Sequence, residues 1–162
     1  MYERRCLSHS FVFYQINIGM NGTDIYFHFK GNSYDAFSFY RSVFGGEFIT
    51  AQRYKDVPGG EKMDPETQEK MIHISLKISP HTTLMATDSM GNEGSGLNIG
   101  NNFHICLQTD SEKEADKLFH ALSKEGKIEM PMNKTFWGAY FGMCLDKFGI
   151  QWMINYSFPS DK

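Results

Sequence analysis

The chain has 162 residues, 41% of them hydrophobic and 22% charged, and a formal net charge of −3. This length suits one folded domain with a sizeable core, and a slightly acidic chain without long basic runs excludes nucleic acid as the main partner. No apolar stretch approaches the ~20 residues that span a bilayer, so no membrane partner is expected.

The three cysteines, Cys6, Cys106 and Cys144, are odd in number and widely spaced. A secreted protein of this size would more often carry an even set that forms disulfides. The pattern therefore favours a reduced, cytoplasmic protein.

Residues 1–19 contain basic residues followed by an apolar stretch that Gln15 and Asn17 interrupt. No small-residue cleavage pattern follows cleanly, and Met20 precedes the first strand-like segment. We expect this segment to be a dispensable extension; a secretion signal or a structured strand remains the alternative.

The first half of the folded chain, residues 24–90, is predicted to contain a strand, a helix and three further strands. Residues 24–30 are rich in aromatic and β-branched types, and Gly31-Asn32-Ser33 then begins a helix that ends near residue 44, before two glycines. The further strands are expected at 47–54, 71–78 and 82–88. Residues 58–70 form a long polar loop that could act as a lid.

Strand 71–78 shows the clearest alternation. Its isoleucines and Leu76 lie on one side, and His73 and Ser75 lie on the other. The apolar side should pack on the helix, so His73 should face the concave side of the sheet.

A linker at 91–100, with four glycines, leads to a second half, residues 101–157. Phe103, Ile105 and Leu107 share one face of its first strand, with His104, Cys106 and Gln108 on the other. A helix follows, capped by Asp110 or Ser111 and running to Lys124. Strands at 136–145 and 150–156 are joined by a hairpin at 146–149. Asp88 and Asp146 are expected to form turns.

The two halves repeat one pattern. Residues 25–48 superpose on 104–127 with an offset of 79, which places Ala36 on Ala115 and Tyr40 on Phe119. The sequence therefore predicts an α+β fold. Two βαβββ modules with pseudo-two-fold symmetry would form a shared concave cavity within one domain, residues 20–162.

This repeat, the segment FYRSVFGGEF, and above all KIEMPMNKTFWGAYFGMCLDKFGIQWMINY resemble the PhnB-like branch of the vicinal oxygen chelate superfamily. That superfamily includes glyoxalase, extradiol dioxygenases and the bleomycin and fosfomycin resistance proteins. The resemblance covers residues 24–157 and implies a homodimer. Members are often labelled 3-demethylubiquinone methyltransferase, but the chain lacks the strand and glycine-rich turn that would hold S-adenosylmethionine.

In the metal-using relatives, four ligands come from the first and last strands of each half. Carried over by the resemblance, these positions are Ile25, Met85, His104 and Met153. Only His104 can bind a hard divalent ion, because thioethers are poor ligands for Mg²⁺, Mn²⁺, Fe²⁺ or Zn²⁺. We therefore expect no metal and no other cofactor.

The expected ligand-binding residues are aromatic, sulfur-containing and imidazole side chains: His104, His73, Phe27, Met85, Cys106, Trp137 and Met153. His104 could instead be a structural histidine, Trp137 a core residue, and Cys106 either inert or a reactive thiol beside His104. No catalytic set is evident.

The leading interpretation is a metal-independent binder, or a PhnB-like enzyme, for a planar or apolar small molecule with one or two polar groups. One alternative is a metal-dependent lyase or dioxygenase with ligands outside the expected positions. The other is an antibiotic-sequestering resistance protein, for which binding is the function.

Overall fold

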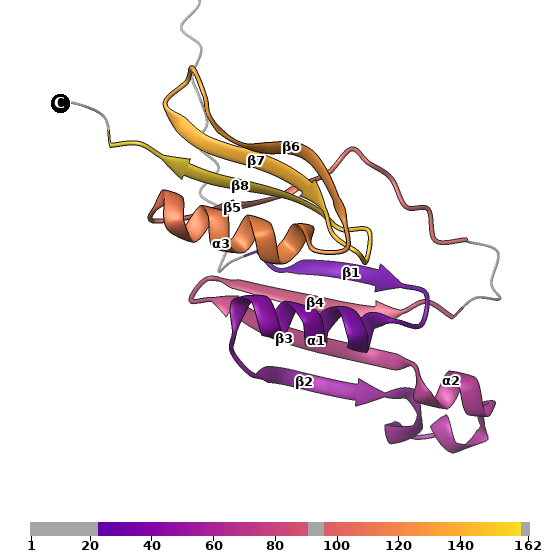
Figure 1. Ribbon diagram of the computed structural model, residues 1–162. Helices are drawn as coiled ribbons and strands as arrows, with labels where there is room; N and C mark the ends of the chain where they lie inside the picture. The colour runs from indigo at the N-terminus through magenta and orange to yellow at the C-terminus, as the bar shows by residue number, and fades with distance from the viewer. Residues whose placement is uncertain (1–22, 91–95, 160–162) are drawn as a thin grey trace, which may run out of the picture.

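The computed structural model describes residues 23–90 and 96–159, which form two modules with the same element order (Figure 1). The first module contains β1 (Ile25–Phe29), α1 (Ser33–Phe44), β2 (Phe48–Arg53), β3 (Met71–Ser79) and β4 (Thr82–Asp88). The second contains β5 (Ile105–Gln108), α3 (Glu112–Ser123), β6 (Lys127–Lys134), β7 (Ala139–Leu145) and β8 (Gln151–Ser157). The proposed extension, residues 1–19, lies outside the described residues. In the described part of the chain no helix is long and apolar enough to cross a membrane.

Each module has a four-stranded mixed sheet. Sheet A has the order β1-β4-β3-β2 and sheet B the order β5-β8-β7-β6. In both, the first strand runs parallel to the last, and the other neighbours are antiparallel. The predicted α+β class with two similar modules is confirmed.

The two helices begin in different ways. At α1, the Asn32 side chain makes no capping bond; the Asp88 carboxylate at the end of β4 accepts the backbone N–H groups of Gly31 and Ser33 instead, at 3.1 and 3.0 Å. At α3, Ser111 accepts the Glu114 N–H in the way the sequence predicted. The strand end of module one therefore fixes the start of its helix.

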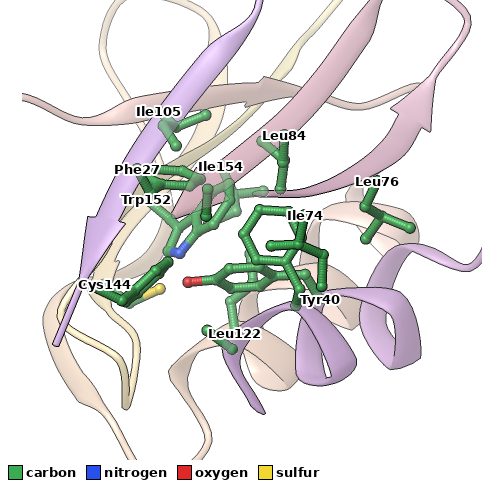
Figure 2. Packing of buried hydrophobic residues seen from close by; sticks show 14 of the residues in the cluster. Phe27, Tyr40, Ile74, Leu76, Leu84, Ile105, Leu122, Cys144, Trp152 and Ile154 are labelled. Carbon is green, nitrogen blue, oxygen red and sulfur yellow. The ribbon is translucent and has the colours of Figure 1, made fainter. Parts of the chain in front are cut away.

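The helix-covered faces of the two sheets share one hydrophobic core (Figure 2). Tyr40 of α1 packs edge-on against Trp152 of β8, with ring centroids 5.7 Å apart. The Asp146 carboxylate, 2% exposed, accepts 2.8 Å hydrogen bonds from the Tyr40 hydroxyl and the Trp152 indole N–H. Its other oxygen accepts the N–H groups of Phe148 and Ile150 in the β7–β8 hairpin. One buried carboxylate thus joins the two modules.

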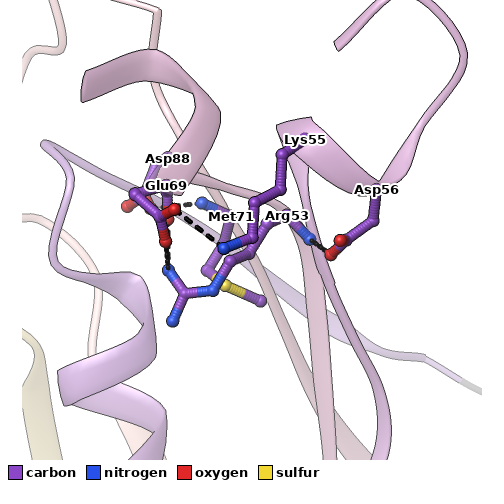
Figure 3. Close-up of polar contacts among 6 residues, drawn as sticks. All are labelled: Arg53, Lys55, Asp56, Glu69, Met71 and Asp88. Carbon is purple, nitrogen blue, oxygen red and sulfur yellow. Dashed lines mark hydrogen bonds and ion pairs between the residues drawn. The ribbon is translucent and has the colours of Figure 1, made fainter. Parts of the chain in front are cut away.

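The segment between β2 and β3 was predicted as a long irregular loop. It contains two short 3₁₀ turns and the helix α2 (Pro65–Glu69). Glu69 forms ion pairs with Lys55 at 2.7 Å and with Arg53 at 3.6 Å, and Asp56 accepts the Arg53 N–H (Figure 3). These contacts hold the segment against the β2–β3 end of sheet A, so the lid interpretation has no structural support.

The structure departs most from the sequence-based expectation at β6 and at the start of β7. The strand expected at 136–145 begins only at Ala139, because Thr135–Gly138 forms a turn in which Gly138 has φ of 83°. The strand β6 was not located, since its residues do not alternate and include Pro131. Two register shifts in its pairing with β7 explain the lost alternation.

Candidate functional site

Each sheet has one helix-covered face and one helix-free face, and strand alternation assigns residues to them. In β5, Ile105 is buried and Leu107 packs on the core, whereas Cys106 is exposed. His104 directly precedes β5 and lies two residues before Cys106, so the two side chains point to the same side of the sheet. It is therefore on the helix-free face of sheet B, as the sequence predicted.

The partner of His104 on that face is a carboxylate. His104 Nε2 lies 3.2 Å from Glu129 Oε2, and their side chains are 15% and 29% exposed. Glu129 belongs to β6, which is the opposite edge of sheet B from β5. In a flat sheet these edges would be about 14 Å apart, at roughly 4.8 Å per strand. Contact between the two side chains therefore requires the helix-free face to be concave.

The modules are not related by one offset throughout. The helices align with the predicted offset of 79, since Ala36 and Ala115 are both fully buried. The core-facing residues are Phe27 and Phe29 in β1 and Ile105 in β5. Aligning core-facing residues of β1 with those of β5 therefore requires an even offset, which 79 is not. Ile25, which packs on the core, is therefore not equivalent to His104, and this assignment is corrected.

A pocket of about 720 Å³ lies between the modules. Module one contributes Ile25, the end of α1 at Val43 and Phe44, and the β3–β4 turn. Module two contributes residues 103–108 and the outward side of α3, including Lys117. About half of the lining is aliphatic or aromatic, and the other half is polar, including His104, Gln108 and the opposite charges of Glu114 and Lys117. Such a lining suits a molecule with an apolar body and a few polar groups.

The Cys106 thiol is held in its neutral form. Although the residue is exposed, partial burial of its sulfur raises the pKa of the thiol, and this outweighs the lowering effect of the 3.4 Å hydrogen bond from the Gln108 amide. A nucleophilic cysteine would need a lowered pKa. The reactive-thiol interpretation is therefore disfavoured.

Three of the predicted residues share the helix-free face of sheet B. His104, Cys106 and Met153 belong together there, because Met153 is the register partner of Cys106. His104 and Cys106 also line the pocket.

Two further predicted residues lie on the helix-free face of sheet A. His73 Nδ1 is 3.3 Å from the Tyr26 hydroxyl, and Met85 is the register partner of both Tyr26 and Ser75. None of these residues lines the pocket of 720 Å³. The structure thus separates His73 and Met85 from His104.

The remaining two predicted residues lie elsewhere. Phe27 is 8% exposed and packs against Phe37 and Tyr40 of the helix-covered core, so its assignment to the cavity wall is corrected. The expectation overlooked that β1 places residues 26 and 28, not 27, on the helix-free face. Trp137 lies in the β6–β7 turn, 55% exposed, with Phe136 against it.

Sequence reasoning missed Glu129 and Tyr26. Glu129 was hidden because β6 carries no alternating pattern. Tyr26 could have been found, because Tyr26 and His28 alternate with the buried Phe27 and Phe29.

The side chains around the expected metal positions do not fit a hard divalent ion. The carried-over positions supply a phenol or an isoleucine from β1, two thioethers from Met85 and Met153, and one imidazole. Glu129 adds one carboxylate beside His104, which makes two suitable donors at most. Among the described residues, no three His, Cys, Asp or Glu side chains converge to form a metal site.

Residues 29–154 match the family described as Glyoxalase/Bleomycin resistance protein/Dioxygenase superfamily. The curated Protein YjdN of Escherichia coli (strain K12) is 30% identical over 138 residues, which cover 80% of this chain and 91% of that protein.

Two solved structures share the fold over most of their length. Protein PA1353 from Pseudomonas aeruginosa has 33% identity and a TM-score of 0.74, covering 85% of this chain and 98% of that one. A structure from Bacillus cereus titled as a putative 3-demethylubiquinone-9 3-methyltransferase, PhnB protein, has 24% identity and a TM-score of 0.68. It covers 83% of this chain and 98% of its own. At that identity the second likeness shows the fold alone.

Proposed function

Because the chain belongs to the Glyoxalase/Bleomycin resistance protein/Dioxygenase superfamily, we propose that it binds a small organic molecule in the pocket between its modules. The ligand is planar or apolar and carries one or two polar groups. The observation that carries this proposal is the position of His104 and Cys106 in a pocket of about 720 Å³ to which both modules also contribute apolar side chains.

His104 is the residue that orients the ligand. Its contact with Glu129 holds the imidazole at the pocket wall, and the exposed 15% of its side chain leaves room for one ligand contact. Lys117 and Glu114, also in the lining, offer one cation and one anion to polar groups of the ligand. Binding of this kind requires no metal, and the donor set around His104 supports metal independence.

The test is a thermal-shift screen of planar aromatic and aliphatic acids, ketones and phenols against the full chain. A ligand that binds the folded state raises the melting temperature, and the stabilisation grows with the logarithm of its free concentration relative to its Kd. We expect hits whose shift is reduced by His104→Ala and retained in His120→Ala. His120 is a matched control, because it lies outside the pocket lining and its contacts, with Asp116 and Phe119, are within its own helix. Hits that are indifferent to both substitutions would contradict this site.

Metal independence is tested separately. Elemental analysis of protein purified without a chelator is expected to find no stoichiometric Zn²⁺, Ni²⁺, Mn²⁺ or Fe²⁺. One such ion per chain, lost in His104→Ala, would favour the metal-dependent lyase or dioxygenase instead. If a hit is an antibiotic and is released unchanged, sequestration is the better description.

A homodimer in the cytoplasm completes the proposal. Sheet edges at β2 and β6 and exposed apolar side chains such as Ile128 and Trp137 support association with a second copy. Cys106 and Cys144, both free thiols, suit a reducing compartment. Light scattering should give about twice the single-chain mass of 18.6 kDa at micromolar concentration, and a monomer mass would contradict the dimer.

A further inference from the structure

Sheet B carries a row of sulfur side chains across its strands. Cys106 of β5 is in register with Met153 of β8, Met153 with Met143 of β7, and Met143 with Met130 of β6. Register partners on neighbouring strands point to the same face and lie about 5 Å apart at Cβ. The regular part of the row therefore crosses β5, β8 and β7 with one thiol and two thioethers, and Met130 stands opposite Met143 at a bulge of the edge strand.

The row lies on the helix-free face. Its neighbours on the same strands, Ile105, Trp152 and Cys144, form the buried row of the opposite face. Cys106 is exposed, Met153 and Met143 are half-buried, and Met130 is 43% exposed. The sulfur atoms of the row are thus accessible from one side only.

The same face is concave, as the His104–Glu129 contact between opposite edges requires. Curvature inclines the side chains of successive strands toward one another above the sheet. Three flexible side chains on adjacent strands, Cys106, Met153 and Met143, can then reach a common point.

Thiolate and thioether donors discriminate among metal ions. They bind soft ions such as Cu(I) and exclude Mg²⁺, Ca²⁺ and Mn²⁺, which prefer oxygen. Met153, which replaces a hard-ion ligand at one of the carried-over positions, is itself a donor that suits a soft ion.

We propose that Cys106, Met153 and Met143 form a binding site for a soft monovalent cation of the Cu(I) type. The Cys106 thiol loses its proton to solvent as the Cys106 Sγ–metal bond forms, and no electron is transferred. One thiolate and one monovalent cation give a neutral complex, which a half-buried face accommodates at low desolvation cost. Met130 extends the row at the edge strand.

Module one provides an internal contrast. On its helix-free face Met85 is in register with Tyr26 and Ser75, so a single thioether lies between a phenol and a hydroxyl. No sulfur row crosses the described part of sheet A. The inference therefore concerns sheet B only, and it shares with the organic-ligand site the single residue Cys106.

The experiment is an anaerobic competition titration of Cu(I) between the full chain and a chromophoric Cu(I) chelator. Cys6 lies outside the described residues, so all variants carry Cys6→Ser. We expect one Cu(I) per chain, and a loss of affinity of at least about tenfold in Cys106→Ser, in Met153→Leu and in Met143→Leu. Met90→Leu is the matched control, because Met90 is an exposed methionine outside the row, and its affinity should equal that of the parent.

Folding is checked by the melting temperature of each variant without metal, and Met153→Leu nearly conserves side-chain volume in case Cys106→Ser perturbs the sheet. Cu(I) binding that persists in all three row variants, or that falls equally in Met90→Leu, would overturn the site. So would Zn²⁺ binding of equal strength that depends on His104 and Glu129 rather than on the methionines. Failure of the organic-ligand screen would leave this outcome unaffected.

Discussion

The two sheets have the same strand order and the same helix position, yet their helix-free faces differ in chemistry. Sheet A presents Tyr26 and His73 in a hydrogen bond of 3.3 Å. Sheet B presents an imidazole–carboxylate pair, His104 and Glu129, beside a row of sulfur side chains and at the edge of the pocket. The two βαβββ modules therefore share a scaffold but not a site. We expect the ligand to contact the helix-free face of sheet B and not that of sheet A.

The largest effect is expected where the two modules are joined. Asp146→Ala removes the acceptor of Tyr40 and Trp152 and leaves both donors buried. Two unsatisfied buried donors and the loss of the hairpin bonds should lower the free energy of unfolding on the order of 4 kcal/mol. Urea denaturation measures this, and the pocket should lose its ligand as the modules separate.

The matched variant in module one is Asp88→Ala. Asp88 accepts the N–H groups of Gly31, Ser33 and Met71, all within its own module. Water can reach some of these groups after the substitution, so the expected loss is about 2 kcal/mol. Equal losses in the two aspartate variants would remove the claim that Asp146 has the additional role of joining the modules.

On the core side of sheet B, Cys144 is expected to make stability depend on pH. Burial in the core raises the pKa of Cys144 to about 12 from 9.0. The folded state keeps this thiol neutral while the unfolded chain ionises, so its contribution to stability is complete below about pH 9 and is lost as the pH rises towards 12. Cys144→Ala should flatten the decline of unfolding free energy in this range. A decline that is unchanged in that variant would contradict the assignment.

A smaller effect is expected at the carboxylate partner of His104. Glu129→Gln keeps the size of the side chain but replaces a charged acceptor by a neutral one. The imidazole should lose its preferred orientation, and affinity for a screened ligand should fall by roughly 1 kcal/mol, the scale of one hydrogen bond. Isothermal titration measures this fall. Glu125→Gln, at an exposed residue paired only with Lys147, is the control and should bind the ligand as the parent does.

The smallest effect is expected on sheet A. Tyr26→Phe removes the exposed 3.3 Å hydrogen bond to His73. Since water replaces the lost partner on both groups, the free energy of unfolding should change by less than about 0.5 kcal/mol, and ligand affinity should not change. A drop in ligand affinity would extend the site to the helix-free face of sheet A.

The sequence predicts those features that depend on local pattern. Alternation in β3 and β5 assigned His73 and His104 to helix-free faces, and the repeat around Ala36 and Ala115 identified both helices. Serine at 111 was correctly expected among the caps of α3. Each of these signals comes from residues close together in the chain.

Other features depend on residues that are distant in the chain. Asp88 and Asp146 were expected to form turns, but the partners that make them important, Ser33 and Tyr40, lie 55 and 106 residues away. Glu129 meets His104 only because sheet B is curved, and the bulges of β6 leave no periodic pattern to predict it. The helices of the two modules align with an offset of 79, but the strands need an even offset, so the number of residues between strand and helix differs. Using 79 throughout therefore matched Ile25, which packs on the core, with His104.

The central claim is that the ligand site belongs to sheet B and the pocket, with His104 as its polar contact. The direct test is to titrate one ligand from the screen into His104→Ala and His73→Ala and to measure the unfolding free energy of both. We predict that His104→Ala weakens binding at least about tenfold, equivalent to roughly 1.4 kcal/mol, and costs on the order of 1 kcal/mol of stability or less, while His73→Ala leaves affinity unchanged. Severe destabilisation by His104→Ala with unchanged affinity, or equal weakening by His73→Ala, would contradict it.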